Sequence, residues 1–184
     1  MRVLNLVLVA GIAGIVALGA APSWADSGGG RVRMEDRCDP TTFNANVAPG
    51  VCVKDGGVTF SEFVAALNPK TGGHHGWKFE DSSLGIESGT TLHVTNVGGE
   101  THSFTEVTSF GKTTFAGLGP FLPLLNAALP PGTPDAVTVA PTPAGWNFVP
   151  SGTSLDLAGL TNGTHRFQCM IHPWMRTTVA VGDH

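Results

Sequence analysis

Apolar and polar residues alternate in short segments along the second half of the chain, and Gly, Asn and Ser residues separate these segments. A period of two places successive side chains on opposite faces of a β-strand. The segments with this pattern are residues 77–79, 84–86, 92–95, 102–105, 163–169 and 177–181. Several short strands with such turns indicate an antiparallel β-sandwich or barrel.

One segment has helical spacing instead. Apolar side chains recur three or four residues apart between Thr59 and Leu67, with Thr59 or Ser61 as a possible N-cap and Asn68-Pro69 as a stop. We therefore expect a short helix there.

Residues 110–150 fit neither pattern. This segment contains eight prolines and an apolar stretch at 115–129. We interpret it as a long Pro-rich insertion with one helical turn near residues 124–129. Long loops within a domain are often functional. The apolar stretch either covers the core or presents a patch to a partner, and we favour the first.

The N-terminal 25 residues resemble a secretory signal peptide. Arg2 is the only charged residue before Asp26, residues 3–21 are almost wholly apolar, and Ser23-Trp24-Ala25 supplies small residues at a cleavage site. We expect residues 1–25 to be removed, which leaves no membrane span; the alternative is an uncleaved anchor. Either way the domain is expected outside the cytoplasm, as a secreted, periplasmic or cell-surface protein.

The amino-acid composition disfavours several classes of protein. The chain has 184 residues, of which 13% are charged, with 25 Gly, 13 Pro, no Tyr and a net charge of −4. These values disfavour coiled coils, helical bundles and nucleic-acid binding. We expect a flexible leader at residues 26–36 within an N-terminal segment, 26–70, and a main domain at 71–184.

The three cysteines are an odd number for an exported protein. Cys38 and Cys52 bracket a turn-rich stretch, and we expect them to form a disulfide that stabilises the fold by roughly 3 kcal/mol. The alternatives are two free thiols or metal ligands.

The third cysteine lies in a C-x2-H-x2-M pattern formed by Cys169, His172 and Met175. Because predicted strands lie on both sides, the connecting turn is short and can direct all three side chains toward one point. A thiolate, an imidazole and a thioether suit copper better than hard cations. A trigonal site needs a second histidine, and His102, which opens a strand after the turn at 96–101, is the best candidate. Zinc is a weaker alternative because Met is a poor zinc ligand.

These residues resemble the cupredoxin family of blue copper proteins, in particular its amicyanin and plastocyanin-like members. The similarity lies in residues 89–96, 98–102, 163–169 and 172–176. It implies a Greek-key β-sandwich with one type 1 copper ion held by His102, Cys169, His172 and axial Met175. Where the family often has Asn after its first ligand histidine, this chain has Ser103.

The resemblance implies a small exported carrier of single electrons, which we expect to be a monomer with an unidentified redox protein partner. Electrons would leave through the edge of His172, with Pro173 and Trp174 around it. A copper oxidase or nitrite reductase domain would need a His beside Cys169, where Gln168 and Met170 stand instead. A non-redox copper-binding or storage protein, or an accessory copper domain of an oxidoreductase system, remains an alternative.

The remaining histidines carry weaker signals. His74 and His75 stand together between glycines without spaced partners, so we expect a polar surface loop rather than a second metal site. His93 alternates with Leu92 and Val94 and is expected to face solvent.

Overall fold

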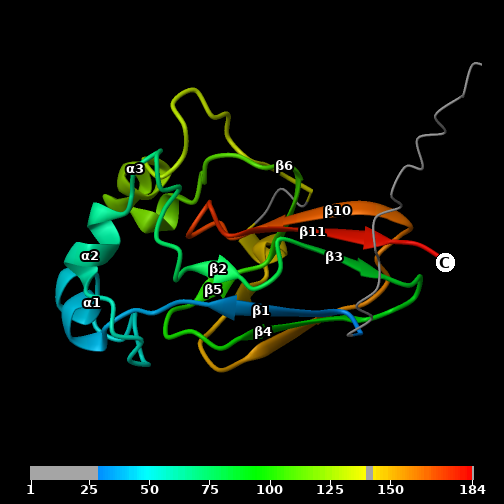
Figure 1. Cartoon of the computed structure of the whole chain (residues 1–184), viewed down its shortest axis with the longest axis horizontal. Coiled ribbons are helices and arrows are strands. Elements are labelled where there is room, and N and C mark those ends of the chain that lie inside the picture. The colour runs from blue at the N-terminus through cyan, green and yellow to red at the C-terminus, as the bar shows by residue number, and fades with distance from the viewer. Residues whose placement is uncertain (1–28, 140–142, 184) are drawn as a thin grey trace, which may run out of the picture.

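Two β-sheets face each other, and short helices lie at one end of them (Figure 1). This arrangement comes from a computed structural model that describes residues 29–139 and 143–183. The predicted signal peptide, residues 1–25, lies outside the described residues. Side chains from both sheets and from the helices share one hydrophobic core.

The first sheet has four strands in the order β2-β1-β4-β9. Strands β1 and β4 run parallel, whereas the β1–β2 and β4–β9 pairs are antiparallel. The bounds are β1 Arg31–Glu35, β2 Lys78–Phe79, β4 Leu92–Asn96 and β9 Ser154–Leu157.

The second sheet has five strands in the order β3-β11-β10-β6-β7, and a separate two-stranded ladder joins β5 to β8. Strands β3 and β11 run parallel and the other pairs are antiparallel. The bounds are β3 Ser83–Ile86, β5 His102–Ser103, β6 Thr105–Ser109, β7 Val137–Thr138, β8 Phe148–Val149, β10 Gly163–Gln168 and β11 Arg176–Val181.

The predicted all-β sandwich is confirmed, with one correction. The expectation of purely antiparallel sheets is wrong for the β1–β4 and β3–β11 pairs. In both pairs the two strands are far from consecutive in the chain, so a connection that crosses the fold can bring them together parallel, which a tight hairpin cannot do.

The expected flexible leader is wrong for residues 31–35, which form β1 inside the first sheet. Val32 and Met34 are buried, whereas Arg31 and Arg33 are exposed. Apolar and polar residues alternate along this strand, as in other half-buried strands. Its polar positions are arginines and it follows a Gly-rich run, and this composition is typical of a flexible leader. Because β1 contributes to the common core, the core is not divided at residue 70.

Two helices follow β1 and are held by side-chain caps. Helix α1 (Pro40–Asn46) begins after Asp39, whose carboxylate accepts a hydrogen bond from the backbone of Thr42. Helix α2 (Phe60–Ala65) confirms the predicted helix and has a capping box between Thr59 and Glu62. We refer to residues 37–77, which contain α1, α2 and the chain leading to β2, as the cap.

The predicted disulfide is confirmed, because Cys38 and Cys52 are bonded. It lies against the loop before β5: a Cβ atom placed on Gly99 would come within 2.6 Å of the Cys38 Sγ atom. The disulfide therefore closes a loop within the cap and packs against the loop that leads to His102, and Val53 of the cap donates a backbone hydrogen bond to the Gly99 carbonyl of that loop at 2.9 Å.

The Pro-rich insertion covers the core, as favoured above, through the buried side chains of Leu125 and Ala128. Its described part contains the 3-10 turns η1 (Ala116–Leu118) and η2 (Pro143–Trp146), helix α3 (Phe121–Asn126), β7 and β8. Helix α3 begins three residues before the predicted helical turn, because Pro120 and Pro123 occupy the helix start, where no backbone N–H is needed.

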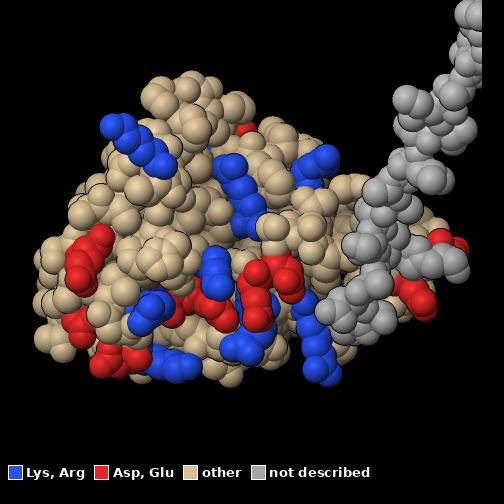
Figure 2. Space-filling model, in the orientation of Figure 1, with Lys and Arg blue, Asp and Glu red and all other residues tan. Residues whose placement is uncertain are grey.

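Charged side chains are unevenly spread over the face drawn in Figure 2. They gather over the sheet that contains β1, whereas the region of α3 is largely uncharged (Figure 2). Among the described residues, no helix is long and apolar enough to cross a membrane.

Candidate metal centre

The fold brings His102, Cys169 and His172 together at the end of the sandwich near the cap. Cys169 directly follows β10, and Met175 directly precedes β11. Two backbone hydrogen bonds close the turn between these strands: Cys169 donates to the Met175 carbonyl at 3.0 Å, and Met175 donates to the His172 carbonyl at 2.9 Å. His102 opens β5, which pairs with β8 of the insertion.

The three side chains direct their donor atoms toward one point. The Nδ1 atoms of His102 and His172 each lie 4.0 Å from the Cys169 Sγ atom, and they lie 3.2 Å from each other. These atoms form a group within 4.8 Å that could hold a metal ion. Cys169 is the free cysteine among the described residues.

Backbone N–H groups also face the sulfur. Ser103 and His172 donate to the Cys169 Sγ atom at 3.3 and 3.4 Å. The Ser103 hydroxyl accepts a hydrogen bond from the backbone of Met170 at 2.7 Å. Ser103 thus ties the loop of the first histidine to the loop of the cysteine, although it replaces the Asn that is common in the cupredoxin family.

A buried carboxylate orients His102. The Nε2 atom of His102 lies 3.0 Å from Asp36 Oδ2, and both side chains are fully buried. Asp36 also accepts hydrogen bonds from the backbone of Cys38, Gly99 and Glu100. An ionised carboxylate only accepts, so the ring donates from Nε2 to Asp36 and its Nδ1 atom is the nitrogen that faces Cys169.

A second buried carboxylate stands beside His172. Glu100 Oε2 lies 3.6 Å from the His172 Nε2 atom and accepts a hydrogen bond from the indole N–H of Trp77. Each predicted ligand histidine therefore has a carboxylate at the ring nitrogen that faces away from the sulfur. Such partners fix the ring orientation of metal-ligating histidines.

These contacts shift the pKa values of the buried thiol, imidazole and carboxyl groups. Burial raises the pKa of the Cys169 thiol, but hydrogen bonds and charge from His102 and His172 outweigh it and hold that pKa well below its usual range. Burial lowers the pKa of His102, but Asp36 and the Cys169 sulfur raise it to about 10. Burial raises the pKa of Asp36, but hydrogen bonds from His102 and the backbone lower it to about 2. The pKa of Glu100 is raised, chiefly by burial.

All four predicted ligands are shielded from solvent: His102 and Cys169 are 0% exposed, Met175 is 1% exposed and His172 is 2% exposed. The His172 ring therefore does not reach the surface, and its role as the exit for electrons stays a prediction. The physical reason is the cap, because Phe63 packs edge-on against His172 with 6.0 Å between ring centroids, and Trp77 lies at 6.4 Å. Pro173 is buried and Trp174 half-buried.

The donor set suits a soft or borderline metal. A thiol with a depressed pKa is ready to act as a thiolate, and two imidazoles present Nδ1 beside it. Thiolate, imidazole and thioether together favour copper over hard cations. Met175 lies in the same buried turn, and its role as the axial ligand stays a prediction.

Comparisons with known proteins give matches among solved structures alone. The sequence matches no model of a known protein family and no curated protein. Among solved structures, a purple cupredoxin from Nitrosopumilus maritimus is 16% identical with a TM-score of 0.39, over 62% of this chain and 94% of that one. The chain is similar to cupredoxins. Amicyanin from Paracoccus versutus is 14% identical with a TM-score of 0.35, over 56% of this chain and 72% of that one. A reduced amicyanin variant is 20% identical, also with a TM-score of 0.35.

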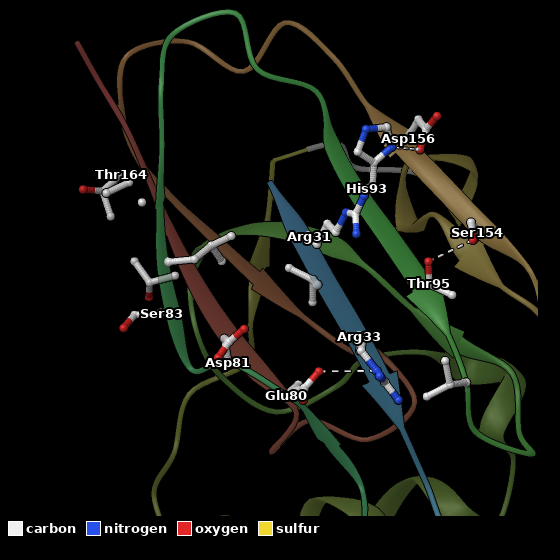
Figure 3. Close-up of a pocket in the computed structure, with 16 residues that line it drawn as sticks. Arg31, Arg33, Glu80, Asp81, Ser83, His93, Thr95, Ser154, Asp156 and Thr164 are labelled. Atoms are coloured by element: carbon white, nitrogen blue, oxygen red, sulfur yellow. Dashed lines mark hydrogen bonds and ion pairs between the residues drawn. The ribbon is translucent and has the colours of Figure 1, made fainter. Parts of the chain in front are cut away.

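A groove elsewhere on the sandwich is lined by residues of both sheets (Figure 3). Two charged pairs lie along the first sheet at this groove: Arg33 lies 3.3 Å from Glu80, and His93 lies 2.7 Å from Asp156. His93 is exposed, as predicted. None of the three clustered metal-ligand candidates lines this groove.

His74 and His75 form a surface loop, as expected. Their rings stack at 4.6 Å, His74 is half-buried, and His75 is exposed. They belong to neither of the two potential ligand groups found among the described residues. The second of those groups, Asp36, Cys38 and Glu100, contains a disulfide sulfur.

Sequence reasoning missed Asp36, Glu100 and Trp77. Glu100 stands two residues before His102 within the stretch that carries the family resemblance, so its position was an available signal. Nothing in the sequence marks Asp36, because it reaches His102 only through the pairing of β1 with β4.

Proposed function

We propose that this protein is an exported type 1 blue copper protein that carries single electrons between redox partners. The observation that carries the proposal is the buried arrangement of two imidazole Nδ1 atoms around a cysteine sulfur, with both outer imidazole nitrogens facing carboxylates. His102, Cys169, His172 and Met175 would hold the ion. Bound copper would supply a one-electron couple.

The chain's own residues support a carrier over an enzyme. The cap and the insertion exclude water from all four predicted ligands, so no small substrate has an open path to the ion. Rigid, dry surroundings also keep the donor atoms in place when the charge of the site changes. Asp36 and Glu100 hold the two imidazoles, and Ser103 holds the sulfur, without help from solvent.

Export rests on two supports: the signal-like residues 1–25 and the disulfide between Cys38 and Cys52, a bond that persists outside the cytoplasm. A copper storage protein is the alternative function. Storage requires tight binding but no reversible one-electron couple.

The test is to unfold the purified protein in urea, refold it with cupric ion present, and record its visible absorption and electron paramagnetic resonance spectra. We expect an intense thiolate-to-copper band that is lost in Cys169→Ser and retained in His93→Gln, a surface control. A colourless parent protein, or a band that survives Cys169→Ser, contradicts the proposal. Reversible voltammetry then separates a carrier from a storage protein.

A further inference from the structure

The cap closes the route by which an exposed ligand histidine would exchange electrons, so the site needs another outlet. His172 is 2% exposed beneath Phe63, Trp77 and Trp174. The rate of electron tunnelling falls steeply with distance. The outlet should therefore be the surface segment that is joined to His172 by the shortest series of side-chain contacts.

One line of contacts runs through Glu100. The His172 Nε2 atom lies 3.6 Å from Glu100 Oε2, which accepts the indole N–H of Trp77. The Trp77 ring lies edge-on to His74 at 5.1 Å, and His74 stacks on exposed His75 at 4.6 Å. This line leads from a predicted ligand to the surface without a gap.

A second line runs through Trp174, whose ring centroid lies 5.5 Å from that of His172. The backbone of Gly73 lies flat against this indole: a Cβ atom at Gly73 would come within 2.3 Å of the ring. Gly73 has a φ of +88°, which glycine adopts without strain. Both lines therefore end on one short segment, residues 71–76.

This segment contains no acidic residue, Lys or Arg, since it reads Thr-Gly-Gly-His-His-Gly. Charges of both signs stand around it, with exposed Arg37, Glu62 and Lys70 nearby in space or sequence. Depleted charge at the centre with a polar rim is the usual pattern of a protein–protein contact.

We propose that residues 71–76, together with half-buried Trp174, form the electron port of this protein and the docking surface for a one-electron redox protein. This inference rests on the proposed function. In the transfer, one electron passes from the reduced site to the partner's oxidised centre, no bond forms or breaks, and the port side chains remain unchanged. The partner's contact face is uncharged at its centre.

The test uses charged one-electron reagents as probes of where electrons leave the copper-loaded protein. His75→Glu places a negative charge on the port, and His93→Glu places the same charge on β4, outside it; both positions are exposed. Stopped-flow mixing of the reduced protein with ferricyanide, and of the oxidised protein with hexaammineruthenium(II), gives the rate constants.

We expect His75→Glu to slow oxidation by the anionic reagent several-fold and to speed reduction by the cationic one, with the visible spectrum and reduction potential unchanged. The differences should vanish near 1 M salt, where the screening length is about 3 Å. His93→Glu should change the rates much less.

Equal rates for His75→Glu and the parent, or a larger effect of His93→Glu, overturn the port while leaving the copper proposal intact. A parent without the thiolate-to-copper band overturns the proposed function, and the port with it.

Discussion

The buried Asp36–His102 pair gives the most direct test of how the site is held, and Asp36→Asn is the change that tests it. The carboxylate accepts from His102 and from three backbone N–H groups, and its side chain has no exposed surface. An amide keeps the size of the side chain but removes the charge. It also points its NH2 group toward donors that need an acceptor.

The size of the effect follows from the acidity of Asp36. Its pKa falls from an ordinary 3.8 to about 2 in the folded protein. Since a lowering of the pKa by one corresponds to about 1.4 kcal/mol, ionised Asp36 contributes roughly 2–3 kcal/mol to the free energy of unfolding near neutral pH. Loss of that contribution corresponds to a fall in Tm of roughly 5–10 °C for a chain of this length.

The assay is urea unfolding of the metal-free protein, because a bound ion would add its own stabilisation. Asp156→Asn is the matched control: it also breaks an Asp–His pair, but that pair is exposed, with 63% of the Asp156 side chain accessible. We expect the control to cost less than about 1 kcal/mol. If Asp36→Asn is no more destabilising than Asp156→Asn, the reasoning about the buried pair fails.

The pH dependence supplies a second readout of Asp36. Because its folded pKa is depressed, its contribution is present above pH 3.8 and is lost as the pH falls toward 2. The parent should therefore lose more stability than Asp36→Asn across this interval. If the free energies of unfolding of the parent and of Asp36→Asn fall equally between pH 3.8 and 2, the lowered pKa of Asp36 is contradicted.

Two further predictions concern the cap. Replacing Cys38 and Cys52 together by Ser should lower the free energy of unfolding by roughly 3 kcal/mol, measured in urea, since it releases a loop closed over 14 residues; unchanged stability would contradict the stabilising role of the disulfide. Gly73→Ala should cost about 1–3 kcal/mol and alter tryptophan fluorescence, because the new methyl group collides with Trp174. Gly72→Ala, also at positive φ but in open space, is the control for backbone strain alone, and equal costs would refute the collision.

Much of the sandwich could be predicted from the sequence because its strands bury one face. The alternation around Val94 and around Phe167 marks β4 and β10 without knowledge of their partners. The cluster of Cys169 and His172 was predictable for a related reason: both residues lie in one short turn, so sequence distance limits spatial distance.

The cap and the carboxylates were not predictable, because they depend on long-range pairing. Asp36 approaches His102 only after β1 has joined β4 in parallel register. The burial of His172 arises from Phe63 and Trp77, more than ninety residues earlier in the chain. Helix α2 itself was predicted from its spacing, but the surface on which it packs has no local signature.

The cap also has a consequence for how the protein would acquire the proposed copper ion. Cys169, His102 and His172 have almost no exposed surface, so an ion in solution cannot reach them while residues 37–77 are in place. Uptake and release must therefore wait for local opening of the cap, whose Phe63 and Trp77 pack against His172. The folded protein should load slowly and retain its ion for long periods. If the proposed function holds, we expect loading to be fastest during folding, before the cap has docked, so that delivery of the metal would be linked in time to the maturation of the chain.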